Sequence, residues 1–189
     1  LIIPDVHLSG IDDPVQARLV EELDSLECEQ LYFLGDLFHF WWGMEQAVFA
    51  EYVPVLAALH RLQRRGTRVT LIRGNHDYRA GPFLEKELGV QVVDEARFVH
   101  GDTRYLLVHG DQADLSRGYR FARWVLRGWP FALLMRILGT GGAHAMGAWI
   151  TGTSRAHAGT PERLVAAQRL WAEEQLRGDV DVVIMGHSH

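Results

Sequence analysis

Five short apolar runs in this sequence each stop at a group of His, Asp or Asn residues, and this feature constrains the fold most. In chain order the groups are Asp5-Val6-His7, Gly35-Asp36, Gly74-Asn75-His76-Asp77, Val108-His109-Gly110-Asp111 and Gly186-His187-Ser188-His189. Short apolar runs bounded by turn residues are typical of buried strands. Ligands of α/β proteins bind beyond the carboxyl ends of strands. We therefore expect these groups, scattered in sequence, to converge in space.

The segments between the runs carry helix signals. Asp13-Pro14 combines an N-cap carboxylate with a proline at the first helical position, and the helix is expected to reach about Leu26. Apolar residues recur at steps of three and four between Val48 and Leu62, which indicates an amphipathic helix. Further helices are expected over 83–88, over much of 116–150, and from Thr160-Pro161 onward. The expected strands are 1–4, 30–34, 68–72, 90–93, a hairpin of 96–100 with 104–108, and 181–185. Strands that alternate with helices predict a layered α/β fold.

Composition narrows the class of protein. A chain of 189 residues corresponds to one domain, and 48% hydrophobic with 23% charged residues is typical of a globular protein. No apolar run reaches the roughly 18 residues of a membrane span, and the start of the sequence lacks the shape of a signal peptide. The single Cys28 cannot form an internal disulfide, which favours a reducing compartment, so a cytoplasmic location is expected. A net charge of −5 argues against a nucleic-acid partner.

One segment differs sharply from the rest. Between Leu115 and Arg155 there is no acidic residue, while arginine and aromatic residues are frequent. The arginines are Arg117, Arg120, Arg123, Arg127, Arg136 and Arg155. Glycines at 139, 141 and 142 indicate a loop inside this segment. Such a shift in polarity predicts a separate structural unit with a different kind of neighbour.

The strand-end residues are suited to binding metal. Carboxylates, imidazoles and one amide suit Mn, Fe or Zn, and the absence of cysteine disfavours a structural zinc site. Seven candidate ligands are too many for one ion with an open position, but fit two ions. A pair of ions can stabilise the attacking and leaving oxygens in a displacement at phosphorus. Asp36, central in the chain order, is the natural bridging carboxylate.

Together, the five blocks resemble the calcineurin-like metallophosphoesterase superfamily, whose pattern is D-x-H, G-D, G-N-H-D/E, H and G-H-x-H in this order. The resemblance spans the whole chain and implies a single domain over 1–189, a β-sandwich of two mixed sheets flanked by helices. It implies that Asp5, His7 and His189 hold one metal and that Asn75, His109 and His187 hold the other, with Asp36 shared. Family members continue past G-H-x-H, so we expect this chain to be part of a longer protein.

The blocks around Asp5, Asp36 and His109, together with Gly74-Asn75-His76-Asp77, further resemble the branch that hydrolyses the pyrophosphate of UDP-2,3-diacylglucosamine to UMP and a lipid 1-phosphate. That branch carries an inserted helical cap after the H-G-D block, which implies a cap over 115–160 here. Arginines pair with phosphate, and apolar surface beside them suits acyl chains or a membrane face. The candidate substrate-binding residues are Arg117, Arg120, Arg155, Arg163 and Trp41, although core packing is as good an interpretation of Trp41.

We expect a water that two metal ions activate to attack phosphorus. Mn is the ion expected first, and Fe and Zn remain alternatives. His76 is the candidate general acid for the leaving oxygen, and the adjacent Asp77 is expected to orient its ring. The superfamily pattern has this histidine, whereas one well-known branch has arginine at the same place.

Other interpretations stay open. The chain can act on a different phosphodiester, a nucleotide or a phosphoprotein, or it can be a non-catalytic scaffold, although no ligand position is damaged. The arginine-rich helix can be a solvated face or bind a protein partner. The remaining histidines His39, His60, His144 and His157 are interpreted as structural, with His39 the least secure because it lies near Asp36. His100-Gly101-Asp102 repeats the H-G-D string at an expected hairpin turn and is also interpreted as structural.

Overall fold

The computed structural model describes residues 1–41, 48–77, 79–157 and 161–188, without the side chains at 140, 143, 144, 148–157 and 161. The first sheet is parallel, in the order β1 (Ile2–Ile3), β2 (Gln30–Phe33), β3 (Arg68–Ile72), β4 (Gln91–Val93). The second contains β5 (Glu95–His100), β6 (Thr103–Val108) and β7 (Val182–Met185), with β5 antiparallel and β7 parallel to β6. Asp94 alone separates β4 from β5, so the chain passes directly from one sheet to the other.

The strands of the first sheet are parallel because helices connect them. These are α1 (Pro14–Ser25), α2 (Val53–Arg64) after a 3-10 turn at Ala50–Tyr52, and α3 (Pro82–Lys86). Asp13 caps α1 as the sequence predicts, since its Oδ1 accepts from Val15 N at 2.8 Å. The apolar pattern that predicts the second helix begins at Val48, which is too early, because α2 itself starts only at Val53.

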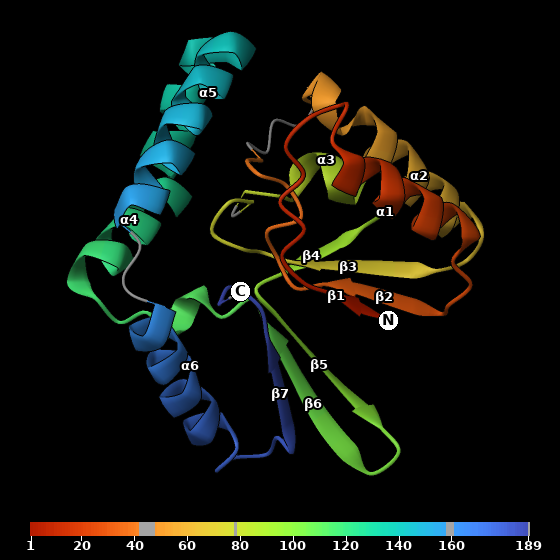
Figure 1. The fold of residues 1–189 in the computed structure, drawn as a ribbon, viewed down its shortest axis with the longest axis vertical. Coiled ribbons are helices and arrows are strands. Elements are labelled where there is room, and N and C mark those ends of the chain that lie inside the picture. The colour runs from red at the N-terminus through yellow and green to blue at the C-terminus, as the bar shows by residue number, and fades with distance from the viewer. Residues whose placement is uncertain (42–47, 78, 158–160, 189) are drawn as a thin grey trace.

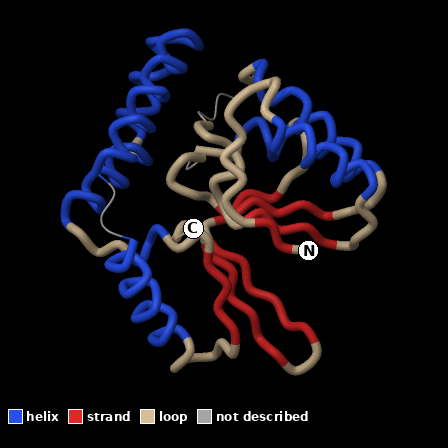
Figure 2. The backbone as a smooth tube through the Cα atoms, viewed as in Figure 1, coloured by secondary structure: helices blue, strands red, loops and turns tan. Residues whose placement is uncertain are grey.

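The molecule is layered (Figures 1 and 2). Helices α1 and α2 cover one face of the first sheet, the two sheets meet face to face, and α6 (Pro161–Gln175) covers the second sheet. A cluster containing Leu34, Ile72 and Leu107 fills the space between the sheets. Trp171 of α6 packs on the residues of β6. The expected two-sheet architecture is confirmed, although only the second sheet is mixed among the described residues.

The arginine-rich segment forms an arm of helices outside these layers (Figure 1). It contains α4 (Arg117–Arg127) and α5 (Trp129–His157), and α5 is interrupted at Gly139, whose φ of 65° and ψ of −173° are not helical. Met135 before the break and Met146 after it pack in one cluster with Phe40, so the chain folds back at Gly139. The sequence predicts a loop at glycines 139, 141 and 142, but of these three only Gly139 has backbone angles that are not helical. In the described part of the chain, no helix is long and apolar enough to cross a bilayer.

Candidate metal centre

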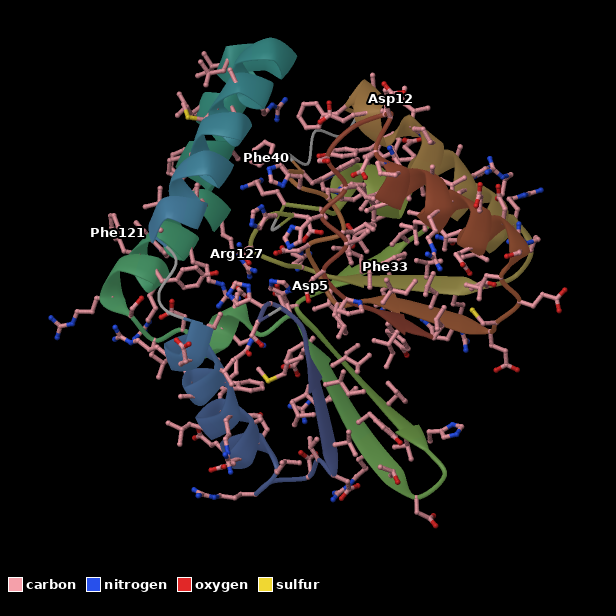
Figure 3. All side chains as sticks on the ribbon, viewed as in Figure 1. Asp5, Asp12, Phe33, Phe40, Phe121 and Arg127 are labelled. Atoms are coloured by element: carbon pink, nitrogen blue, oxygen red, sulfur yellow. The ribbon has the colours of Figure 1, made fainter. Side chains whose placement is uncertain are left out.

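The carboxyl ends of strands from both sheets meet at one place, where the predicted ligands gather (Figure 1). Asp5 and His7 follow β1, Asp36 follows β2, Asn75 follows β3, His109 follows β6 and His187 follows β7. Figure 3 shows Asp5 at this junction. His189 lies outside the described residues.

Asp36 lies between two groups of potential ligands. In one group, potential ligand atoms of Asp5, His7 and Asp36 lie within 4.8 Å of one another, and in the other the same holds for Asp36, His109 and His187. Oδ2 of Asp36 is 3.6 Å from Nε2 of His7 and 3.4 Å from Nε2 of His109. The amide oxygen of Asn75 is 3.0 Å from the same nitrogen of His109. The arrangement brings together six of the seven residues that the sequence predicts as ligands.

The backbone is strained at these residues. Among the described residues, those other than glycine with positive φ are Asp5 (40°), His7 (54°), Asp36 (50°) and His187 (74°). Such conformations cost on the order of 1–3 kcal/mol each and persist where the surroundings enforce them, often at functional sites. All four are predicted metal ligands, so the strain coincides with the site.

Glycines permit the close approach of the loops that carry the ligands. A Cβ at Gly74 would collide with Oδ1 of Asp36, and one at Gly186 would lie 2.5 Å from Oδ2 of Asp5. Gly35 combines φ of 88° with a position where a Cβ would lie 2.6 Å from Nδ1 of His109. These three glycines are therefore required by packing against the predicted ligands.

The charges of the clustered side chains shift the pKa values of Asp36, His109 and His187. Burial opposes both charges of the His109–Asp36 pair, but their mutual attraction dominates: it lowers the pKa of Asp36 and raises the pKa of His109 to about 9. Burial, together with the charge of His109, lowers the pKa of His187 to about 4. These shifts favour an ionised Asp36 beside a cationic His109, and a neutral His187 next to that ring. A divalent cation would replace the proton of His109.

Asp77 supports the loops rather than the ring of His76. Its oxygens accept from Gly74 N at 2.7 Å and from Leu37 N at 2.9 Å, which ties the loop after β3 to the loop after β2. Burial and the charge of Asp36 raise the pKa of Asp77 to about 7. The ring of His76 instead has its Nδ1 2.8 Å from the carbonyl oxygen of His39. The orienting role that the sequence assigned to Asp77 is thus filled by a backbone carbonyl.

The structure also changes the interpretation of Trp41 and His39. Trp41 is 2% exposed and packs against Phe38 and Tyr52 in the core, so it does not line a substrate site as one sequence interpretation had it. The ring of His39 lies 5.6 Å from that of His76, beside the metal centre. Sequence spacing alone placed His39 near Asp36 but gave no partner for its ring.

Of the predicted substrate arginines, the three whose side chains are described are exposed to solvent. Arg117 and Arg120 are exposed on α4 and Arg163 is exposed on α6, while the side chain of Arg155 is not described. The sequence missed a contact of α4 with the centre: Tyr119 donates to Oδ2 of Asp111 at 2.9 Å, and Arg123 Nε lies 3.2 Å from the same oxygen. Asp111 is buried two residues after His109. The spacing of Tyr119 and Arg123 by one helical turn is the signal that could have found this contact.

Comparison with known proteins agrees with this geometry. The model of the family described as calcineurin-like phosphoesterase matches residues 1–189. A UDP-2,3-diacylglucosamine hydrolase of Pseudomonas savastanoi pv. phaseolicola is 32% identical over 161 residues, covering 82% of this chain and 64% of the relative. Its counterpart in Haemophilus influenzae is 34% identical over 113 residues, covering 58% of this chain and 47% of the relative.

Among solved structures, a nuclease of Pseudomonas putida is 32% identical with a TM-score of 0.36, covering 57% of this chain and 51% of that one. This chain spans between about half and two-thirds of the length of the curated relatives.

Proposed function

Because this chain belongs to the calcineurin-like phosphoesterase family, we propose that it hydrolyses a phosphate ester at a centre of two divalent cations that share Asp36. The observation that carries the proposal is that Asp36 belongs to both ligand groups. Asp5 and His7 complete one group, with His189 proposed alongside them from the family pattern. His109 and His187 complete the other, with Asn75 beside them.

The residues present fit such ions. The donor set mixes carboxylates and imidazoles with one amide oxygen, which suits Mn, Fe or Zn, and we propose Mn as the ion to test first. Two ions at this centre would lower the pKa of a water and stabilise the charge that develops on the phosphoryl oxygens. The protein contributes fixed ligands on strained loops, so little rearrangement is needed when the ions bind.

His76 is proposed to protonate the leaving oxygen. Its main-chain N donates to Oδ1 of Asp36 at 2.9 Å, which fixes the residue beside the shared ligand. With Nδ1 facing the carbonyl oxygen of His39, the proton on Nδ1 is held there and Nε2 is the atom that exchanges a proton with substrate. The acid form is therefore the imidazolium, and turnover should require it.

The shared ligand provides the decisive test. We expect Asp36→Asn to lose most bound Mn and to reduce hydrolysis of an aryl phosphodiester by more than about a hundredfold, since losing a ligand is more severe than losing a supporting contact. Elemental analysis and initial rates measure both effects, and His60→Gln, a change at an exposed position on α2, is the control. Full activity in the Asp36 variant would overturn the proposal.

The substrate we propose is the nucleotide–lipid pyrophosphate UDP-2,3-diacylglucosamine, cut to UMP and the lipid 1-phosphate. Support comes from the names of the relatives and from the segment over 115–160, which we propose is a cap over the acyl chains. Its exposed arginines, with Arg163, would contact phosphate groups. Aromatic and aliphatic side chains are exposed on the same arm: Trp124 (72%), Trp129 (76%) and Ile137 (74%).

The same arm is proposed to rest on a lipid surface. Figure 3 shows Phe121 on the outer side of α4 and Arg127 on the side that faces the core. Exposed apolar residues beside arginines, with no acidic residue between 115 and 155, suit an anionic membrane face. A peripheral location on that face follows from the proposal.

Matched variants test both ideas. Ile137→Ser is expected to raise KM for the acylated substrate and to reduce sedimentation with anionic phospholipid vesicles, without changing hydrolysis of the aryl diester. Val99→Ser, at a similarly exposed (66%) residue of the β5–β6 hairpin, should change none of these. If the acylated substrate is not cleaved while the aryl diester is, the lipid assignment fails and the phosphoesterase assignment stands.

A further inference from the structure

A third group of potential metal ligands lies beside the centre and contains only histidines. Potential ligand atoms of His7, His39 and His76 lie within 4.8 Å of one another. The ring of His76 is 4.9 Å from that of His7 and 5.6 Å from that of His39, measured between centroids. We propose that these three imidazoles form an inhibitory site for Zn²⁺ or Cu²⁺, which competes with the paired metals for His7.

Main-chain hydrogen bonds join the three loops that carry these histidines. His7 N donates to Asp36 O at 2.8 Å, and His39 N donates to Leu8 O at 2.9 Å, so the loops after β1 and β2 are paired. The loop after β3 joins them, since Trp41 N donates to the carbonyl oxygen of His76 at 3.0 Å. All three residues therefore lie on loops that are joined by main-chain hydrogen bonds, and the ring of His76 is further placed by the carbonyl oxygen of His39.

The chemistry of this group differs from that of the paired centre. It offers imidazole nitrogens and no carboxylate, and divalent affinity at such nitrogen sites rises from Mn²⁺ towards Cu²⁺, with Zn²⁺ also well above Mn²⁺. Three histidines are a sufficient protein ligand set for zinc. Nδ1 of His76 faces the carbonyl oxygen of His39, so Nε2 is the atom that can ligate. The group therefore selects against the ion proposed for the paired centre.

The proposed inhibitory ion and the paired ions would compete because both need His7 as a ligand. A neutral imidazole has one free lone pair and binds one cation. His7 Nε2 lies 3.6 Å from Oδ2 of Asp36, in the group with Asp5. An ion held by His7, His39 and His76 thus withdraws His7 from the pair and also engages Nε2 of His76. This consequence rests on the proposed function, because it matters only if the pair and His76 act in hydrolysis.

The test compares Zn²⁺ binding by the Mn-loaded protein and by its His39→Gln variant. Equilibrium dialysis against increasing Zn²⁺, followed by elemental analysis of Zn and Mn, measures binding without any substrate. We expect wild-type protein to take up Zn and release Mn at concentrations about tenfold or more below those needed for the variant. Inhibition of aryl diester hydrolysis by Zn²⁺ should shift by the same factor, and His60→Gln should behave as wild type.

Equal Zn²⁺ affinity in wild type and His39→Gln would overturn the inference, because direct exchange of Zn for Mn in the pair does not involve His39. If His39→Gln does not fold, X-ray absorption at the Zn edge of wild-type protein with one equivalent of Zn²⁺ decides instead. Coordination by three imidazoles with no carboxylate, and solvent in the remaining position, supports the site, whereas coordination that includes a carboxylate overturns it. Failure of the proposed function would appear separately, as absence of diester hydrolysis with no Zn²⁺ added.

Discussion

At the scale of single residues, charge and close contact define the centre. His109 is fully buried, yet the carboxylates around it raise its pKa to about 9. The carboxylates Asp36, Asp111 and Asp5 outweigh the opposing effect of burial. Without bound ions, His109 would therefore carry a proton at a nitrogen that is proposed to bind metal.

The raised pKa of His109 predicts how metal binding depends on pH. A cation requires the neutral imidazole of His109, so a proton must leave when the ion binds. Below the raised pKa the proton competes, and apparent Mn affinity should increase with pH by up to about tenfold per unit until pH reaches about 9. Calorimetry in buffers of different ionisation enthalpy measures the proton released. Affinity that does not change with pH between 6.5 and 9 would contradict the assignment.

Gly74 provides a steric prediction. A Cβ there would collide with Oδ1 of Asp36, which is buried and accepts from His76 N, and would lie 2.6 Å from the main-chain N of Asp36, which cannot rotate away. Gly74→Ala should therefore displace Asp36, reduce bound Mn and abolish most diester hydrolysis. Gly10→Ala, where a Cβ would meet nothing within 4 Å, is the control. Wild-type metal content in Gly74→Ala would show that the loops tolerate the displacement.

At the scale of elements, α4 is joined to the rest of the molecule by polar contacts. None of its residues is buried, in contrast to α2, which buries five. Besides the contacts of Tyr119 and Arg123 with Asp111, Arg127 Nη1 lies 3.1 Å from Asp94 Oδ1, and Arg79 donates to the carbonyl oxygens at the end of the helix. The position of α4 thus depends on polar contacts, among them those with Asp111, two residues after the proposed ligand His109.

Removing one ion pair should loosen α4 without unfolding the layers. Arg123→Gln leaves Asp111 buried with one fewer partner, which should destabilise the docked helix by about 1–3 kcal/mol. Hydrogen exchange of the α4 amides should increase, and KM for an acylated substrate should rise more than that for the aryl diester. Arg120→Gln, on the exposed part of the same helix, is the matched control for hydrogen exchange alone, because Arg120 is itself a proposed phosphate contact. Unchanged exchange in Arg123→Gln would mean that other contacts dock the helix.

At the scale of the whole molecule, the centre joins the two sheets. Asp5, His7 and Asp36 extend from the parallel sheet, whereas His109 and His187 extend from the second sheet. Ions bound between them would act as a cross-link between layers that otherwise meet through an apolar cluster. Folding and metal binding should therefore be linked.

The linkage predicts the effect of metal on thermal stability. Mn at about one hundred times its dissociation constant should stabilise the fold by ~2.7 kcal/mol, which corresponds to a rise in Tm of roughly 5–10 °C for a chain of this size. Differential scanning fluorimetry with chelator and with added Mn measures the shift. The rise should be absent in Asp36→Asn, and a similar rise in that variant would place the stabilising ion elsewhere.

The sequence determined the order of strands and helices and nearly all candidate ligands. An apolar run that ends at glycine and a polar residue is a local pattern, and parallel strands bring such ends to one edge whatever packs around them. Asp36, His109 and His187 were identified in this way. The helix start at Asp13-Pro14 and the hairpin turn at Gly101-Asp102 were equally local.

Tertiary structure alone decided which side chains meet. The burial of Trp41, the role of Asp77 as a clamp between loops, and the contact of Arg123 with Asp111 all depend on how distant segments pack. The position of His39 beside His76 depends on the pairing of two loops that are separated by the whole of α2. Sequence patterns encode the periodicity and breaks of each element, but not the side-chain directions and distances between elements, which only the packed layers fix.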